Sequence, residues 1–151
     1  MKKDNEWNGE CFYCDSCGKA FRSPLYDVTK EYEYTIFYDT PRIPEVEIMG
    51  AEVIANYCSI TCRQKHRNQI LKREKIHATF PDIGPTETCS RCHGPVLMTS
   101  FHLAFVEMDT EQNWGQPILG ANVISSQLIS VVCTKCEPIP FKIARAIDWD
   151  S

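Results

Sequence analysis

Long apolar segments are missing from this sequence. No stretch of its 151 residues approaches the roughly 18 consecutive apolar residues that a membrane-spanning helix needs. The first residues, Met1–Trp7, include two lysines without an apolar core behind them, so we expect no secretory signal. A hydrophobic content of 43% is nevertheless typical of a globular chain rather than a disordered one. These features predict a cytoplasmic protein without a membrane partner.

Cysteine, in contrast, is plentiful, with nine copies. In a chain that is not exported the thiols stay reduced, so a disulfide framework is disfavoured and metal binding becomes the first alternative. Eight of the nine form four close pairs, and two such pairs supply the four thiolates of a closed tetrahedral zinc site. The predicted ligands of two structural Zn²⁺ ions are Cys14, Cys17, Cys58, Cys62, Cys89, Cys92, Cys133 and Cys136.

The spacing of the pairs also indicates an internal repeat. Forty residues separate Cys17 from Cys58, and forty separate Cys92 from Cys133. A sequential assignment, with the first two pairs on one ion and the last two on the other, is favoured over an interleaved one, which the spacing leaves open. Cys11 and His66 each lie near a pair and could replace a ligand, but a free thiol and a surface or capping histidine are the simpler interpretations.

Sequence motifs of common catalytic sites are absent. There is no His-Glu-x-x-His, no Gly-x-Ser-x-Gly and no His-x-Glu ahead of a cysteine pair. A site closed by four cysteines also has no open position for a water nucleophile. We therefore expect no enzyme activity and no catalytic residue.

Each half is predicted to be a long antiparallel β-hairpin between two cysteine pairs. Residues 26–38 alternate between tyrosine-rich and acidic positions, and the returning arm is 46–57. In the second half the arms are 96–108 and 118–132, with a loop at 109–117. Ser59 is a suitable N-cap for a helix that runs to about residue 77. The prediction is a small, zinc-stabilised α+β fold with modules at 1–77 and 89–151 and a linker at 78–88.

Two segments resemble known zinc modules. The stretch Cys14-Asp15-Ser16-Cys17-Gly18-Lys19-Ala20-Phe21, followed by a hairpin and Tyr57-Cys58-Ser59-Ile60-Thr61-Cys62-Arg63, resembles a treble-clef zinc finger of the type named after its Met-Tyr-Met motif (MYM/TRASH-like). The pairs Cys89-Ser90-Arg91-Cys92 and Cys133-Thr134-Lys135-Cys136 resemble a zinc ribbon. These resemblances imply zinc and a small fold, and they leave the function open because such folds serve many roles.

Charge is distributed unevenly and favours a protein partner. Residues 27–57 carry two basic and seven acidic groups, next to several tyrosines. We expect this surface to be exposed and to bind a basic protein, because tyrosine and tryptophan are favoured interface anchors. One concrete form is an inhibitor or immunity-type protein that covers a basic nuclease or other nucleic-acid-processing toxin; an adaptor is another. The candidate contact residues are Glu31, Tyr32, Glu33, Tyr34 and Trp114.

The alternative function is nucleic acid binding, as in a transcription-associated zinc finger. Residues 58–77 carry six basic groups and one acidic group, and a basic helix beside a cysteine pair can lie along phosphates. The overall pI of about 5.6 argues against this alternative, because nucleic-acid-binding domains are usually basic. Its candidate residues are Arg63, Lys65, Arg67, Lys72 and Arg73.

Overall fold

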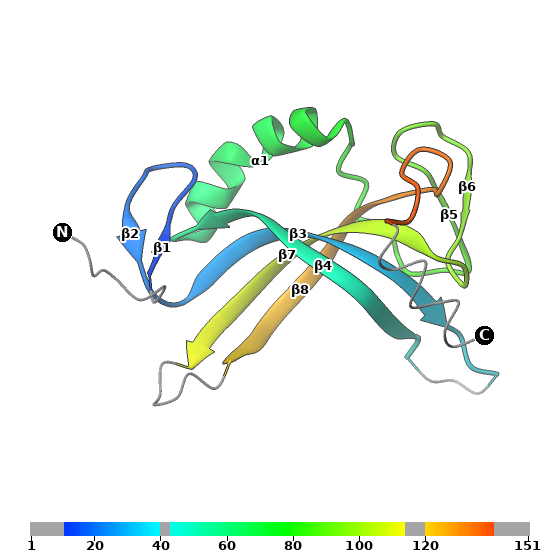
Figure 1. Cartoon of the computed structure of the whole chain (residues 1–151), viewed down its shortest axis with the longest axis horizontal. Coiled ribbons are helices and arrows are strands. Elements are labelled where there is room, and N and C mark those ends of the chain that lie inside the picture. Colours follow the sequence, from blue (N-terminus) through cyan, green and yellow to red (C-terminus); the bar gives the residue numbers. More distant parts are fainter. Residues whose placement is uncertain (1–10, 40–42, 114–119, 141–151) are drawn as a thin grey trace.

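A computed structural model describes residues 11–39, 43–113 and 120–140 of the chain. It is a small α+β fold, as predicted, with a single helix in the described part (Figure 1). The elements in chain order are β1 (Phe12–Tyr13), β2 (Ala20–Phe21), β3 (Leu25–Ile36), β4 (Glu45–Tyr57), α1 (Ile60–Glu74), β5 (Thr86–Thr88), β6 (Pro95–Leu97), β7 (His102–Asn113) and β8 (Gly120–Val132).

The two predicted long hairpins are present as β3–β4 and β7–β8. The first matches its predicted arms closely, because β-branched and aromatic residues alternate along it. In the second, the prediction of one arm over 96–108 is wrong. A turn closed by Ser100 N–H donating to the Leu97 carbonyl separates β6 from β7. β7 then continues to Asn113 through the polar stretch predicted to be a loop, because its backbone keeps pairing with β8.

The two hairpins form one sheet with the strand order β4-β3-β7-β8. β3 and β7 pair antiparallel from Leu25↔Thr110 to Glu33↔His102. The modules predicted as separate units therefore share one sheet. The stretch predicted as a linker also packs on it: the N–H groups of Thr79 and Phe80 donate to the Ile129 carbonyl at 3.0 and 2.9 Å.

The internal repeat extends from the cysteines to the strands. β4 and β8 are related by a shift of 75 residues, and β3 and β7 by a shift of 77. The β-bulges repeat as well: Ile54 and Met49 are the extra residues in β4, and Ile129 and Ile124 are the extra residues in β8. With these shifts, the pair Thr29↔Val106 lies at the centre of an approximate two-fold relation between the hairpins.

Helix α1 begins where the sequence predicts. Ser59 is the N-cap, and its hydroxyl accepts a hydrogen bond from Cys62 N–H at 3.1 Å. The helix ends at Glu74, three residues before the predicted end, because Lys75 adopts a left-handed conformation with φ of 59°. Ile70 and Leu71 point into the core, so the helix covers one face of the sheet (Figure 1).

Two arginines attach α1 to the second hairpin. Arg63 is only 6% exposed and donates to Asp109 at 2.7 Å, and Arg67 makes a bidentate pair with Glu107 at 2.8 Å. Because the helix belongs to the first half and β7 to the second, these ion pairs join the two repeats on the helix side of the sheet.

Phe105 lies at the centre of this shared core and is fully buried. We predict that Phe105→Ala lowers the free energy of unfolding by about 3–5 kcal/mol, because it removes a large side chain and leaves a cavity. Chemical denaturation of the metal-loaded protein measures this. Leu97→Ala is the control: Leu97 is 59% exposed, so its loss changes stability by less than about 0.5 kcal/mol. Equal effects of the two substitutions would show that Phe105 is not a core residue.

Candidate metal centres and the open face of the sheet

The first cysteine cluster joins the beginning and the end of the first hairpin. Cys14 and Cys17 come from the turn between β1 and β2, while Cys58 follows β4 and Cys62 lies in the first turn of α1. Their four sulfur atoms all lie within 4.8 Å of one another. The Sγ–Sγ distance is 3.7 Å from Cys17 to Cys58 and 3.8 Å from Cys58 to Cys62.

The second cluster repeats this arrangement in the second hairpin. Cys89 and Cys92 lie in the turn between β5 and β6, and Cys133 and Cys136 follow β8. Cys92 Sγ is 3.6 Å from Cys133 Sγ, and Cys89 Sγ is 3.9 Å from Cys136 Sγ. Both clusters follow the sequential assignment, and the interleaved alternative is wrong for this structure.

These distances fit a tetrahedral metal site. Four sulfurs at the usual Zn–S distance of about 2.3 Å from a central ion stand about 3.8 Å from one another. A disulfide would bring two sulfurs to about 2.05 Å, and all nine cysteines are free. Each cluster could therefore hold one metal ion with four thiolate ligands.

The turn that carries the first two ligands is the same in both clusters. Cys14 N–H donates to the Lys19 carbonyl and Cys89 N–H to the Gly94 carbonyl, 75 residues later. Gly18 and His93 follow the second cysteine of each turn, and both have positive φ, at 79° and 66°. His93 thus occupies a backbone position that suits glycine best and that histidine tolerates better than most residues.

The electrostatics of the clusters favour ionised thiols at one position of each. Burial raises the pKa of the Cys14 thiol, but hydrogen bonds from backbone N–H groups outweigh it and lower the pKa to about 6. The same balance lowers the pKa of Cys89 to about 6, with N–H donors from Arg91, Cys92 and Cys133. Burial and the neighbouring thiols raise the pKa of Cys58 and Cys136 to about 12. A divalent cation would remove this conflict, because it lets all four thiolates carry charge together.

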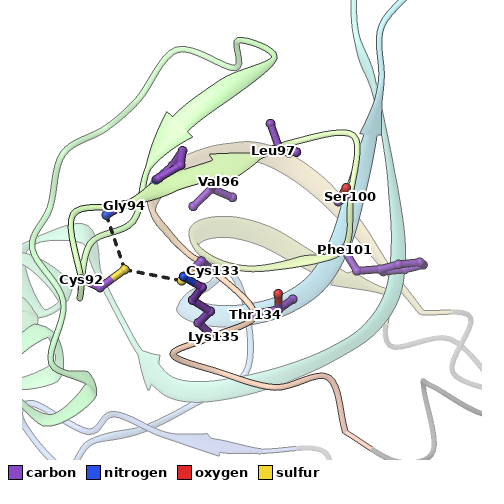
Figure 2. A pocket seen from close by; sticks show the side chains of 10 residues that line it. Cys92, Gly94, Val96, Leu97, Ser100, Phe101, Cys133, Thr134 and Lys135 are labelled. Atoms are coloured by element: carbon purple, nitrogen blue, oxygen red, sulfur yellow. Dashed lines mark hydrogen bonds between the residues drawn. The ribbon is translucent and has the colours of Figure 1, made fainter.

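The second cluster borders an open cavity of about 300 Å³. Figure 2 shows Cys92 and Cys133 facing each other at its edge, with Val96 and Phe101 among the other side chains that line it. The two residues near the pairs lie outside both clusters: His66 Nδ1 is 2.6 Å from the Tyr57 hydroxyl, and Cys11 Sγ donates to the Phe12 carbonyl.

The face of the sheet opposite α1 is open over the described part of the chain and forms a groove of about 610 Å³ (Figure 1). Alternate residues of the central strand β3 make its floor: Asp27, Thr29, Glu31 and Glu33. Apolar side chains of β4, β7 and β8 make its walls: Val46, Ile48, Ala51, Val53, Val106, Met108, Val123 and Leu128. We call this surface the acidic groove.

The carboxylates of the acidic groove are buried. Glu31 and Glu33 are 5% and 4% exposed, so the expectation that they form an exposed surface is wrong. The cause is the strand order: β3 is a central strand, and taller apolar side chains flank it on both sides. Burial, and secondarily the Glu33 charge, raise the pKa of Glu31 to about 7, and burial raises that of Asp27 to about 6.

The other predicted partner residues do not lie in the groove. The tyrosines of β3 face the helix side: the Tyr34 ring packs edge-on against Phe101 at 5.0 Å, and the Tyr32 hydroxyl donates to Glu137. Acidic and aromatic residues therefore lie on opposite faces of the sheet instead of forming one surface. Trp114 lies outside the described residues.

The predicted nucleic-acid-binding residues are divided. Arg63 and Arg67 form ion pairs with Glu107 and Asp109, as described above. Lys65, Lys72 and Arg73 are exposed. The helix therefore offers phosphate three of its five candidate cations, and Arg73 also contacts Glu74 at 3.3 Å.

We predict that Cys14→Ser and Cys89→Ser each lower the bound metal from two ions per chain to one. Loss of one thiolate opens the tetrahedral site and removes the sulfur that most backbone N–H groups contact. Native mass spectrometry measures the stoichiometry. Cys11→Ser is the control and retains both ions. Two ions in either cluster variant would contradict the assignment of ligands.

We predict that Glu31→Gln stabilises the protein above neutral pH. The folded pKa of about 7 exceeds the model value of 4.5, so the folded state holds the proton more tightly. Stability is therefore lost as pH rises from about 4.5 to about 7, and the accumulated cost approaches about 3 kcal/mol. Denaturation of the metal-loaded proteins should show a small advantage of the variant near pH 5 and the full advantage near pH 8. A pH-independent difference would contradict the buried, shifted carboxyl.

Comparisons with known proteins add nothing to this geometry: no family model, no curated protein and no solved structure matches the chain. In the described residues, α1 is neither long nor apolar enough to cross a membrane. The two clusters of four cysteines and the acidic groove are therefore the features from which a function must be inferred.

Proposed function

We propose that this chain is a non-enzymatic protein-binding protein whose scaffold is held by two structural zinc ions. A tetrahedral set of four thiolates favours zinc or an iron–sulfur centre, and a single ion at the observed sulfur spacing is what zinc requires. Zinc sites of small fingers supply roughly 10–16 kcal/mol of apparent binding free energy, which becomes folding free energy here. With every ligand position occupied by a cysteine, the ion has a structural role.

The position of the ligands also supports the proposed module types. In the first cluster, Cys62 lies in the first turn of α1, which is where a treble-clef finger takes its second pair. In the second cluster, both pairs lie in turns next to short strands, as in a zinc ribbon. The shared four-stranded sheet is then an elaboration that joins two small zinc modules.

The observation that carries the binding function is the open, apolar-walled face of the sheet. Ile48, Val53 and Val123 border the groove and are 50%, 50% and 59% exposed. Exposed apolar residues that gather around a groove mark an interaction site more often than a solvated surface. The acidic floor suits a basic partner, which supports the inhibitor or immunity-type form of the hypothesis. Nucleic acid binding through α1 is less well supported, because two of its cations are already paired.

We predict that the double variant Ile48→Ser/Val53→Ser loses its partner. The substitutions remove apolar contact area from one wall of the groove, and no charge changes. Affinity purification from the cells that naturally produce the protein should recover a stoichiometric protein with the wild type and with the control Leu97→Ser, which changes an exposed residue of β6. A partner that the double variant retains, or salt-sensitive recovery of nucleic acid instead, would contradict the proposal.

A further inference from the structure

The floor of the acidic groove contains one buried carboxylate without a cationic partner. Glu33 is 3.2 Å from His102 Nε2, and Asp27 accepts a hydrogen bond from the Thr29 hydroxyl at 2.9 Å. Glu31 lies between them, is 5% exposed and lines the groove. Among the described residues its charged neighbours are Glu33 and Asp27, both of its own sign. A buried charge of this kind is costly unless a partner arrives from outside.

A bare metal ion does not fit this floor. Asp27, Glu31 and Glu33 occupy alternate positions of an extended strand, where successive side chains on one face are about 7 Å apart. In the described part of the chain, the two cysteine clusters are the only groups whose ligand atoms gather closely enough to hold an ion. The missing cation must therefore be carried by something that also fills the apolar walls.

A second copy of this chain does not fit either. Packing two open faces together would place the carboxylates of one groove against those of the other, and like charges removed from water repel strongly. The groove needs an occupant with positive charge along its centre and apolar groups on both sides. A protein segment that contains arginine or lysine between apolar residues has this chemistry.

We propose that the acidic groove binds a cationic, amphipathic segment of a partner protein, in which an arginine or lysine pairs with Glu31 and flanking apolar residues pack on Ile48, Val53 and Val123. This proposal rests on the proposed protein-binding function and specifies the chemistry of the partner. The apolar walls exclude water around the pair, so the charge attraction is stronger than at the surface. The raised pKa of Glu31 in the free groove agrees with a carboxylate that is completed by an incoming cation.

The test is selection from a library of short random peptides on the immobilised, metal-loaded full chain. Selected peptides should carry arginine or lysine flanked by apolar residues. Their affinity for Glu31→Gln, measured by fluorescence anisotropy, should fall by about tenfold or more, because a desolvated charge loses its partner. Glu52→Gln is the matched control: Glu52 is an exposed carboxylate of β4 outside the groove, and its loss should change affinity less than about twofold. Glu31→Gln is expected to be the more stable protein, so weaker binding cannot come from unfolding.

Other outcomes overturn the proposal in distinguishable ways. If binders lack a cation, or bind Glu31→Gln as well as the wild type, but Ile48→Ser/Val53→Ser abolishes their binding, the groove binds proteins and the assignment of Glu31 is wrong. If neither variant changes binding, or no peptide is enriched, the proposed function fails together with its specification. A dimer in sedimentation velocity that the double variant dissociates would show that a second copy occupies the groove, and this too overturns the proposal.

Discussion

The antiparallel pairing of β3 with β7 is the interaction on which the rest of the structure depends. Each hairpin alone is a two-stranded ribbon, and such ribbons are marginally stable in water. Pairing along Leu25–Glu33 and His102–Thr110 turns two ribbons into one four-stranded sheet and creates two distinct faces. One face receives α1, Phe105 and Tyr57, and the other becomes the acidic groove. Core and groove are therefore consequences of the same strand pairing.

The cysteine clusters determine where this pairing can occur. Each cluster fixes the beginning of one hairpin to its end, so the two long arms leave the metal centre side by side. The matching bulges at Ile54 and Ile129 place a kink at equivalent points of β4 and β8. The ion pairs of Arg63 and Arg67 with β7 then attach the helix of the first repeat to the second. Metal ligation acts locally, and these contacts between the repeats carry its effect across the molecule.

The metal ligands could be predicted from the sequence because their spacing is a local property. Pairs such as Cys14 and Cys17 bring two sulfurs to one ion whatever the rest of the fold does. The N-cap at Ser59 was predictable for the same reason. The choice of β7 as the partner of β3 has no local signal, since either strand could have remained at the edge of its own hairpin. Alternation along β3 assigned Glu31 to one face, but only the strand order shows that this face is flanked by apolar walls and buried.

The burial of Glu31 is the point where this chain departs from the rules that make a fold stable. A central strand between apolar neighbours normally places apolar residues on a buried face, yet β3 places three carboxylates there. The equivalent face of β7, related by the approximate two-fold, has Ala104, Val106 and Met108 instead. The acidic stripe is therefore not required by the architecture, because the sister strand forms the same sheet without it. Local violations of folding rules tend to lie at functional sites, where a stabilising substitution removes function. The asymmetry between β3 and β7 thus points to the first repeat as the half that recognises a partner, while the second repeat completes the sheet.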